Sequence, residues 1–331
     1  MSPEVLAQLL AHVPPGYMPK ELLVGTDTAD DAAVYQLNEK QAVIATTDFF
    51  TPIVDDPYDF GRIAAANALS DIYAMGGTPI MALALVGMPL DKLPKEAIAK
   101  ILEGGASICQ EAGIPVAGGH SIDILEPVYG LVGIGVVDPK HLHTNAQAQE
   151  DDILILSKPL GVGMLSAALK KGTLDADAYG EMVKWTTTLN KVGSVISNIE
   201  GVHAITDVTG FGLAGHLLEM CKGAKLQAEV NFSQLPFIEA AIQIAQQGTA
   251  TGASKRNWLS YGDSIELPEN TALWQRNLLT DPQTSGGLLI SCTQEALAQV
   301  QNAIKTMQGN DGAVFGRMMR TDSTGAVRIV F

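Results

Sequence analysis

Apolar positions in the first 137 residues alternate between strand-like and helix-like spacing. Short runs rich in Val and Ile, bounded by polar or glycine residues, are typical of strands, whereas apolar residues repeated every three or four positions indicate helices. The expected strands are Ala32–Leu37, Gln41–Thr47, Ile80–Val86, Ile114–Ala117 and Val128–Val137. The expected helices are Phe60–Met75, Lys95–Ala112 and a short capped helix that starts at Ser2 and carries Val5, Leu6, Leu9 and Leu10.

Polar residues interrupt this pattern between Asp138 and Asp151, and we place a domain boundary there, giving domains 1–138 and 139–331. The expected strands of the second domain are Ile153–Leu156, His203–Thr206, Leu226–Val230, Leu288–Ser291 and two within Gly312–Phe331. The expected helices are Gly163–Lys171, Ala176–Ile199, Phe211–Lys222 and Gln294–Met307. Strands and helices do not alternate strictly, so the pattern predicts an α/β (α+β) protein with mixed sheets and flanking helices rather than a doubly wound fold.

Composition narrows the class of protein. The chain has 331 residues, 47% of them hydrophobic, and a formal charge of −15. No cluster of Lys and Arg offsets this charge, which argues against nucleic acid as a partner. The longest uncharged run, Ile72–Leu90, is broken by Gly76–Pro79, and no signal peptide is evident, so we expect a cytoplasmic protein without a membrane span. The cysteines Cys109, Cys221 and Cys292 have no zinc-site spacing.

Aspartates stand at the ends of several predicted strands. Asp30 and Asp31 precede one strand, while Asp48 and Asp207 each follow another. A single aspartate at such a place is usually a turn or cap residue. Several of them in an acidic, lysine-poor chain favour a shared site in which Mg²⁺ bridges carboxylates and a phosphorylated ligand.

Asp71 adds a carboxylate from a helix. It lies four residues after Asn67 within Phe60–Met75, so the two side chains share one face of that helix. The spacing is compatible with a metal site and equally with pairing at the surface.

Glycine-rich segments offer further candidates. The chain has no P-loop motif, but Gly210–Gly215 matches the dinucleotide fingerprint G-x-G-x-x-G between a predicted strand and helix. Asp207 argues against that interpretation, since its carboxylate would repel a pyrophosphate. Gly118–Ser121 could bring backbone amides to an anion or form an ordinary turn. Asp281–Gly287 could likewise contact a ligand or only turn the chain.

Taken together, these segments resemble the selenophosphate synthetase family. The segments that carry the resemblance are Asp30–Tyr35, Thr46–Phe50, Gly61–Ala65, Ser70–Gly77, Ala117–Asp123, Thr206–Gly212 and Asp281–Gly287. They span nearly the whole chain in the order found in the family. The resemblance implies the two-domain aminoimidazole ribonucleotide synthetase-like fold, usually as a homodimer. It also implies the reaction of ATP, hydrogen selenide and water to selenophosphate, AMP and orthophosphate.

The resemblance also implies a site. It implies that Asp31, Asp71 and Asp207 bind Mg²⁺. It implies that ATP is contacted by Thr28, Ala29, Asp30, Asp48, Asp71, Gly119, His120 and Ser121. In this interpretation the nucleotide is held through metal-bridged carboxylates in place of a P-loop.

One feature of the family has no counterpart here. Family members carry a glycine-rich segment before the first helix, with a Cys or selenocysteine followed by a Lys, whereas the first Cys here is Cys109 and the first Lys is Lys20. We expect this catalytic segment to lie upstream of Met1, so that the given chain binds Mg-ATP but turns over poorly or not at all. The alternatives are a short nucleotide-binding paralogue, a related ATP-dependent enzyme such as a thiamine-monophosphate kinase, and an NAD-dependent dehydrogenase.

Overall fold

The computed structural model describes residues 5, 9, 12, 16–25, 30–320 and 326–331. Most of the helix expected from Ser2, together with Thr28 and Ala29, lies outside the described residues. Among the described helices, none is long and apolar enough to cross a membrane.

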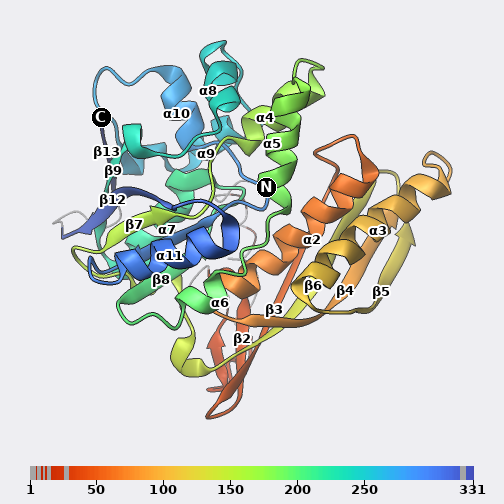
Figure 1. The fold of residues 1–331 in the computed structure, drawn as a ribbon, viewed down its shortest axis with the longest axis horizontal. Helices are drawn as coiled ribbons and strands as arrows, with labels where there is room; N and C mark the ends of the chain where they lie inside the picture. The colour runs from red at the N-terminus through yellow and green to blue at the C-terminus, as the bar shows by residue number, and fades with distance from the viewer. Residues whose placement is uncertain (1–4, 6–8, 10–11, 13–15, 26–29, 321–325) are drawn as a thin grey trace.

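The N-terminal part of the chain forms one mixed sheet in the order β1-β2-β3-β6-β4-β5 (Figure 1). All neighbouring strands are antiparallel except β4 and β5, which are parallel. The strands are β1 (Leu22–Val24), β2 (Ala33–Asn38), β3 (Gln41–Phe50), β4 (Thr78–Met88), β5 (Val116–Asp123) and β6 (Val128–Val137). This order makes β5 an edge strand, three positions away from β3.

Two helices, α2 (Pro57–Ala74) and α3 (Lys95–Ala112), cover one face of this sheet (Figure 1). They pack so closely that a Cβ at Gly61 would lie 1.9 Å from the carbonyl oxygen of Ile101, and one at Gly104 would lie 2.0 Å from that of Tyr58. Small residues at these positions therefore let the two helix backbones approach each other. From Phe60 onward, nearly all of α2 is buried, because it also contacts the C-terminal part of the chain.

The C-terminal part forms a seven-stranded mixed sheet in the order β10-β13-β9-β12-β7-β11-β8. Its strands are β7 (Ile153–Leu156), β8 (Val202–Asp207), β9 (Gln227–Asn231), β10 (Ile265–Glu266), β11 (Leu288–Cys292), β12 (Ala313–Met319) and β13 (Val327–Val330). Side chains alternate across β7: Leu154 and Leu156 pack with α7 (Gly212–Ala224), whereas Ile155 packs with α11 (Leu297–Gln308). Both faces are therefore covered by helices, as the uninterrupted apolar character of β7 requires.

The remaining helices surround the sheet and the region between the two parts. They are α4 (Val162–Lys170), α5 (Ala176–Thr187), α6 (Gly193–Ile196), α8 (Glu239–Gln246), α9 (Gly252–Tyr261) and α10 (Leu273–Leu279). Residues of α4, α5 and α8 belong to the same hydrophobic core as α2 and the N-terminal sheet. The two parts of the chain thus share buried apolar side chains, exemplified by Phe60 and Met164.

The sequence pattern predicted most elements but misplaced several boundaries. Asp48 lies inside β3, not after it, because its backbone pairs with Leu131 of β6. Gly118–Ser121 are also strand residues, because β5 continues to Asp123 alongside β4. Short elements at 22–24, 239–246, 252–261, 265–266 and 273–279 were not predicted.

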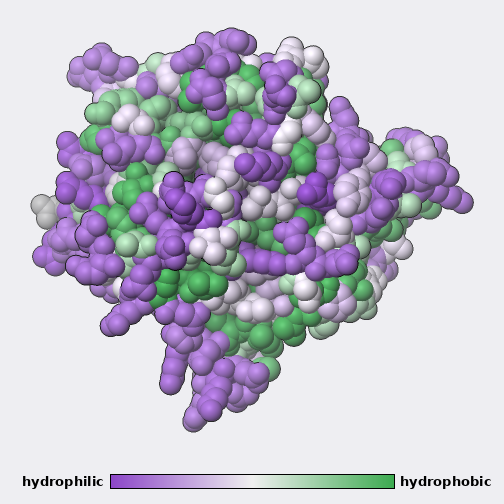
Figure 2. All heavy atoms as spheres, in the orientation of Figure 1, coloured by the Kyte–Doolittle hydropathy of each residue, from purple (hydrophilic) through white to green (hydrophobic). Residues whose placement is uncertain are grey.

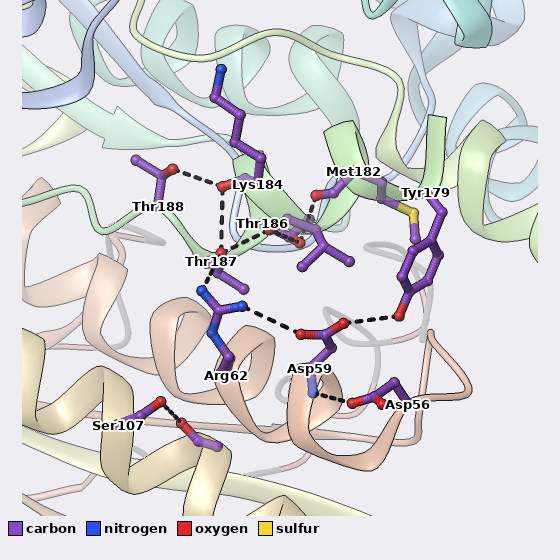
Figure 3. A network of polar contacts seen from close by, with 12 residues as sticks. Asp56, Asp59, Arg62, Ser107, Tyr179, Met182, Lys184, Thr186, Thr187 and Thr188 are labelled. Carbon is purple, nitrogen blue, oxygen red and sulfur yellow. Dashed lines mark hydrogen bonds and ion pairs between the residues drawn. The ribbon is translucent and has the colours of Figure 1, made fainter. Parts of the chain in front are cut away.

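The helix expected over Ala176–Ile199 is instead two helices, α5 and α6. Three consecutive threonines stand at the break, and their hydroxyl groups donate to backbone carbonyls four residues back (Figure 3). Thr186 bonds to Met182 at 2.8 Å, and Thr188 bonds to Lys184 at 2.7 Å. Such local bonds compete with continued helical pairing, and Thr188 already has an extended backbone.

Candidate active site

The aspartates that the sequence singled out come together where the two parts of the chain meet. The hydroxyl of Thr206, on β8, donates to Oδ1 of Asp31 at 2.8 Å. This bond joins the segment before β2 to the C-terminal sheet across 175 sequence positions. Asp31 therefore lies beside Asp207, the last residue of β8.

Helix α2 contributes one carboxylate, Asp71, and an amide, Asn67, that binds another. Asp71 accepts a hydrogen bond from the hydroxyl of Thr46 on β3, and Asn67 donates to Oδ2 of Asp48 at 2.8 Å. Because residues four apart share a helix face, Asn67 and Asp71 both meet the end of β3. The sequence left open whether Asn67 and Asp71 face a metal site or pair at the surface. In the structure both side chains are buried and point into the protein.

Asp207 is bound from the opposite domain. The hydroxyl of Ser70 on α2 donates to Oδ2 of Asp207. Asn190, between α5 and α6, donates to the Ser70 hydroxyl at 2.8 Å and to the carbonyl of Gly286 at 2.8 Å. Each of the four carboxylates therefore has one oxygen oriented by a neutral donor, which fixes the direction of the other.

Burial and mutual electrostatic repulsion shift the pKa values of the four carboxylates. Burial and the nearby charge of Asp207 raise the pKa of both Asp31 and Asp71 well above the ordinary value. The same two causes raise the pKa of Asp48 to about 6. Burial also raises the pKa of Asp207, although the hydrogen bond from Ser70 opposes it. Desolvated carboxylates that repel one another bind a proton or a cation more readily than exposed ones do.

The donor set fits a hard divalent cation better than a softer metal. The cluster consists of carboxylate oxygens with hydroxyl oxygens next to them, and Mg²⁺ prefers oxygen ligands. Within the described residues, no three Asp, Glu, His or Cys side chains lie close enough to enclose an ion by themselves. Mg²⁺ commonly uses one or two carboxylates together with phosphate oxygens. The cluster therefore fits an ion that arrives with a phosphorylated ligand.

Gly119, His120 and Ser121 do not join this cluster within the single chain. The register places Asp48 opposite Leu131, Leu131 opposite Ala84, and Ala84 opposite Gly119. Asp48 and Gly119 are thus in one row of the sheet but three strand spacings apart, roughly 14 Å. The three residues line a pocket of about 370 Å³ between β4, β5 and α3. Asp30 lies nearer the cluster and accepts a bond from the backbone of Asn145 at 3.1 Å.

The Asp281–Gly287 segment has a structural role that its sequence left open. Asp281 accepts from the backbone N–H of Met164 at 3.0 Å, and Gln283 accepts from Gly161 and Val162. These bonds satisfy donors at the start of α4, which have no partners within the helix. Further along, the backbone N–H of Ser285 donates to Asn67 at 2.7 Å. The segment thus links α4, α2 and the carboxylate cluster.

The dinucleotide-like glycines also have packing roles. Helix α7 does begin at Gly212 after β8, as the motif requires. A Cβ on Gly212 would lie 2.8 Å from the carbonyl carbon of Thr280, and one on Gly215 would lie 2.6 Å from the side chain of Phe211. Close packing is therefore a sufficient reason for both glycines.

A second set of contacts between the two parts lies along the outer side of α2 (Figure 3). Arg62 donates to Asp59 at 3.3 Å and to the hydroxyl of Thr187 on α5 at 3.2 Å. Asp59 also accepts from the hydroxyl of Tyr179 at 3.0 Å. Helices α2 and α5 are therefore held by polar groups as well as by their shared core.

Sequence reasoning missed Lys158, Ser70 and Asn190. Lys158 is only 2% exposed and follows β7 in the apolar stretch Ile153–Val162. It is the only charged residue in that stretch, a signal that could have drawn attention to it. Burial lowers the pKa of Lys158 to about 7, while the charge of Asp207 opposes that shift. Ser70 and Asn190 carry no comparable signal, because buried Ser and Asn are found in many helices and loops.

Comparison with known proteins agrees with the two-part architecture. The N-terminal domain model of AIR synthase related proteins matches residues 29–137, and the C-terminal domain model matches residues 149–327. A solved thiamine-monophosphate kinase from Stenotrophomonas maltophilia has a TM-score of 0.68 at 17% identity, covering 98% of this chain and 94% of the other. The fold and the buried carboxylate cluster thus define a two-domain enzyme of the AIR synthase related class.

Closer relatives identify the family. A selenide, water dikinase from Pseudomonas straminea is 60% identical over 320 residues, covering 96% of this chain and 89% of the relative. One from Paraburkholderia xenovorans is 56% identical over 330 residues, covering 100% and 93%. The chain belongs to the selenide, water dikinase family, which is a family of kinase-type enzymes.

Proposed function

We propose that the site in this chain serves the formation of selenophosphate from ATP, hydrogen selenide and water, with release of AMP and orthophosphate. The observation that carries the proposal is the cluster of Asp31, Asp48, Asp71 and Asp207, assembled from both domains, in a chain 60% identical to a selenide, water dikinase. An enzyme that transfers phosphoryl groups mainly positions its reactants and stabilises charge. Carboxylates fixed in direction by neutral donors are suited to that task.

Asp31, Asp71 and Asp207 would hold Mg²⁺ in this proposal. Bound there, the ion would neutralise negative charge on the phosphates of ATP. One oxygen of each carboxylate accepts a hydrogen bond from a hydroxyl group, of Thr206, Thr46 or Ser70. These bonds fix the side-chain rotamers, so the second oxygen of each carboxylate already has a defined direction. Burial keeps water away and strengthens the attraction for a cation.

ATP would lie beside Asp30, Asp48 and Asp71, with Thr28 and Ala29 on the preceding segment. Gly119, His120 and Ser121 remain proposed ATP contacts, although in one chain they lie away from the carboxylates. A site of this kind would use domain 1–138 for nucleotide and metal and domain 139–331 to complete it.

We also propose a homodimer in the cytoplasm. The support is the N-terminal sheet, whose second face has no helix of the described residues over it (Figure 1) and carries exposed Phe49, Ile80 and Ile122. Figure 2 shows hydrophobic residues on the lower right side, below the position of α2 and α3 in Figure 1, whereas the lowest tip of the molecule is hydrophilic. Phe49 and Ile122 also line an apolar pocket of about 210 Å³. Contiguous apolar surface of this kind marks protein interfaces.

Product analysis with ATP and selenide tests the proposed reaction. Selenide-dependent formation of AMP, orthophosphate and selenophosphate supports it, whereas ADP as the nucleotide product favours a thiamine-monophosphate kinase-like activity. ATP binding without turnover, even when a glycine-rich segment with a Cys and a Lys is added before Met1, favours a nucleotide-binding paralogue. The chain is therefore tested alone and with this added segment.

A further inference from the structure

Lys158 connects two segments that orient the carboxylate cluster. Its ammonium group donates to the carbonyl of Thr188 at 2.6 Å and to the carbonyl of Ser285 at 2.9 Å. The two acceptors are 97 positions apart in the sequence, and both are backbone groups outside regular elements. Lysine is suited to such a link because one ammonium group carries three donors.

The first of these two segments contains Ser285, which is linked to the carboxylate cluster through Asn67. Ser285 has a left-handed backbone (φ 48°), which a non-glycine residue adopts only when its surroundings hold it there. Its carbonyl accepts from Lys158, and its N–H donates to Asn67, which in turn donates to Asp48. The Ser285 hydroxyl is buried without a hydrogen-bond partner, so the backbone makes the contacts that matter.

The second segment reaches the site through Asn190, two residues beyond Thr188. Asn190 donates to Ser70, and Ser70 donates to Asp207. Asn190 also donates to the carbonyl of Gly286, beside Ser285. The two segments are therefore joined twice, by Lys158 and by Asn190, and each leads to a different carboxylate.

We propose that Lys158 is a positioning residue, which holds Thr188 and Ser285 so that Asn190 and Asn67 can orient the carboxylates. Transfer of an ammonium group into a buried site is costly, and an apolar side chain of the same length would fill the space at lower cost. Lys158 holds two irregular segments together through hydrogen bonds, which an apolar side chain that only filled the space could not do. The inference rests on the proposed function only in taking Mg-ATP as the ligand of the site.

The test compares Lys158→Met with the wild-type chain. Methionine has nearly the same length and no donors. We expect hydrogen exchange at the amide of Ser285 to quicken about tenfold, and the affinity for Mg-ATP to fall about tenfold in calorimetric titration. This is the scale of one lost hydrogen bond to a charged group. Lys184→Met is the matched control, since Lys184 on α5 is exposed and lies over the Trp185 ring, 4.6 Å from its centre. The control should change neither quantity.

A second variant separates positioning from general stability. Ser285→Gly removes no hydrogen bond and makes the left-handed backbone favourable, so it should restore part of the Mg-ATP affinity lost in Lys158→Met. A general loss of stability would not be rescued in this way. If Lys158→Met does not fold, Lys158→Gln, which keeps one donor group without the charge, takes its place.

The outcomes are distinct. A folded Lys158 variant with wild-type exchange at Ser285 and wild-type affinity for Mg-ATP overturns the inference, as does the absence of any rescue by Ser285→Gly. If the wild-type chain does not bind Mg-ATP, the proposed function fails instead. The exchange measurement needs no nucleotide and still decides whether Lys158 holds Ser285.

Discussion

Asn67 and Ser285 are 218 positions apart in the sequence, and the backbone N–H of Ser285 donates to Oδ1 of Asn67 at 2.7 Å. The same Asn67 side chain donates through Nδ2 to Asp48. One buried amide thus uses its acceptor to bind the C-terminal domain and its donor to orient a carboxylate of the N-terminal domain. Assembly of the two domains and construction of the site are therefore the same event.

Substitution of Asn67 tests this link. We expect Asn67→Ala to lower the free energy of unfolding by about 2 kcal/mol, because it leaves a buried carboxylate and a buried N–H without their partner. Urea denaturation measures the change. Asn198→Ala is the control, since Asn198 is exposed and bonds only within its own segment. Equal losses in the two variants would contradict the role assigned to Asn67.

Arg62 tests the outer contact between α2 and α5. Arg62→Met removes the bonds to Asp59 and Thr187. Because the side chain is 30% exposed, solvent weakens the ion pair, and we expect a loss of about 1 kcal/mol. Lys100→Met removes a more exposed ion pair, with Glu103, and should leave stability unchanged. A larger effect from Lys100→Met than from Arg62→Met would contradict this account.

Asp48 should make the stability of the protein depend on pH. Burial and Asp207 raise the pKa of Asp48 from 3.8 to about 6, so the folded chain holds its proton more tightly than the unfolded chain does. The free energy of unfolding therefore falls as pH rises from about 4 to about 6. Asp48→Asn cannot release this proton. Its stability relative to wild type should increase across that window in denaturation at fixed ionic strength, and a constant difference would refute the prediction.

Lys158 should make the stability of the protein rise with pH, in contrast to Asp48, and at a higher pH. Its pKa is about 7 in the folded protein and 10.5 ordinarily, so the unfolded chain binds the proton more tightly. Stability from this group therefore rises with pH between about 7 and 10.5. Wild type should gain stability relative to Lys158→Met over that range. Parallel pH profiles for the two proteins would show that Lys158 does not titrate differently on folding.

Gly119 is expected to be indispensable for the edge of the N-terminal sheet. A Cβ there would lie 2.0 Å from the carbonyl oxygen of Ala84, and the backbone has φ 152°. We expect Gly119→Ala to destabilise the protein by about 2 kcal/mol, because β5 must move away from β4. Gly180, inside α5, has open space around it, and Gly180→Ala should stabilise by about 0.5–1 kcal/mol. Thermal unfolding of both variants would reveal whether the signs differ as expected.

The sequence allowed most strands and helices to be predicted, because local spacing of apolar residues carries that information. The helix at Lys95–Ala112 and the strand at Val128–Val137 have the bounds that the pattern predicted. Boundaries set by tertiary contacts or by hydrogen bonds from side chains were less accessible. The extension of β5 through two glycines depends on pairing with β4, and the end of α5 depends on threonine hydroxyls that bond back to its own carbonyls.

By itself, the sequence determined that Asp31, Asp71 and Asp207 are unusual, since Asp31 and Asp207 stand at the ends of predicted strands and Asp71 shares a helix face with Asn67. Only the tertiary structure decided which donors orient them. Ser70, Asn190 and Lys158 act through partners 30 to 137 positions away. No local pattern encodes such contacts, because partners so far apart in the sequence meet only when the chain has folded.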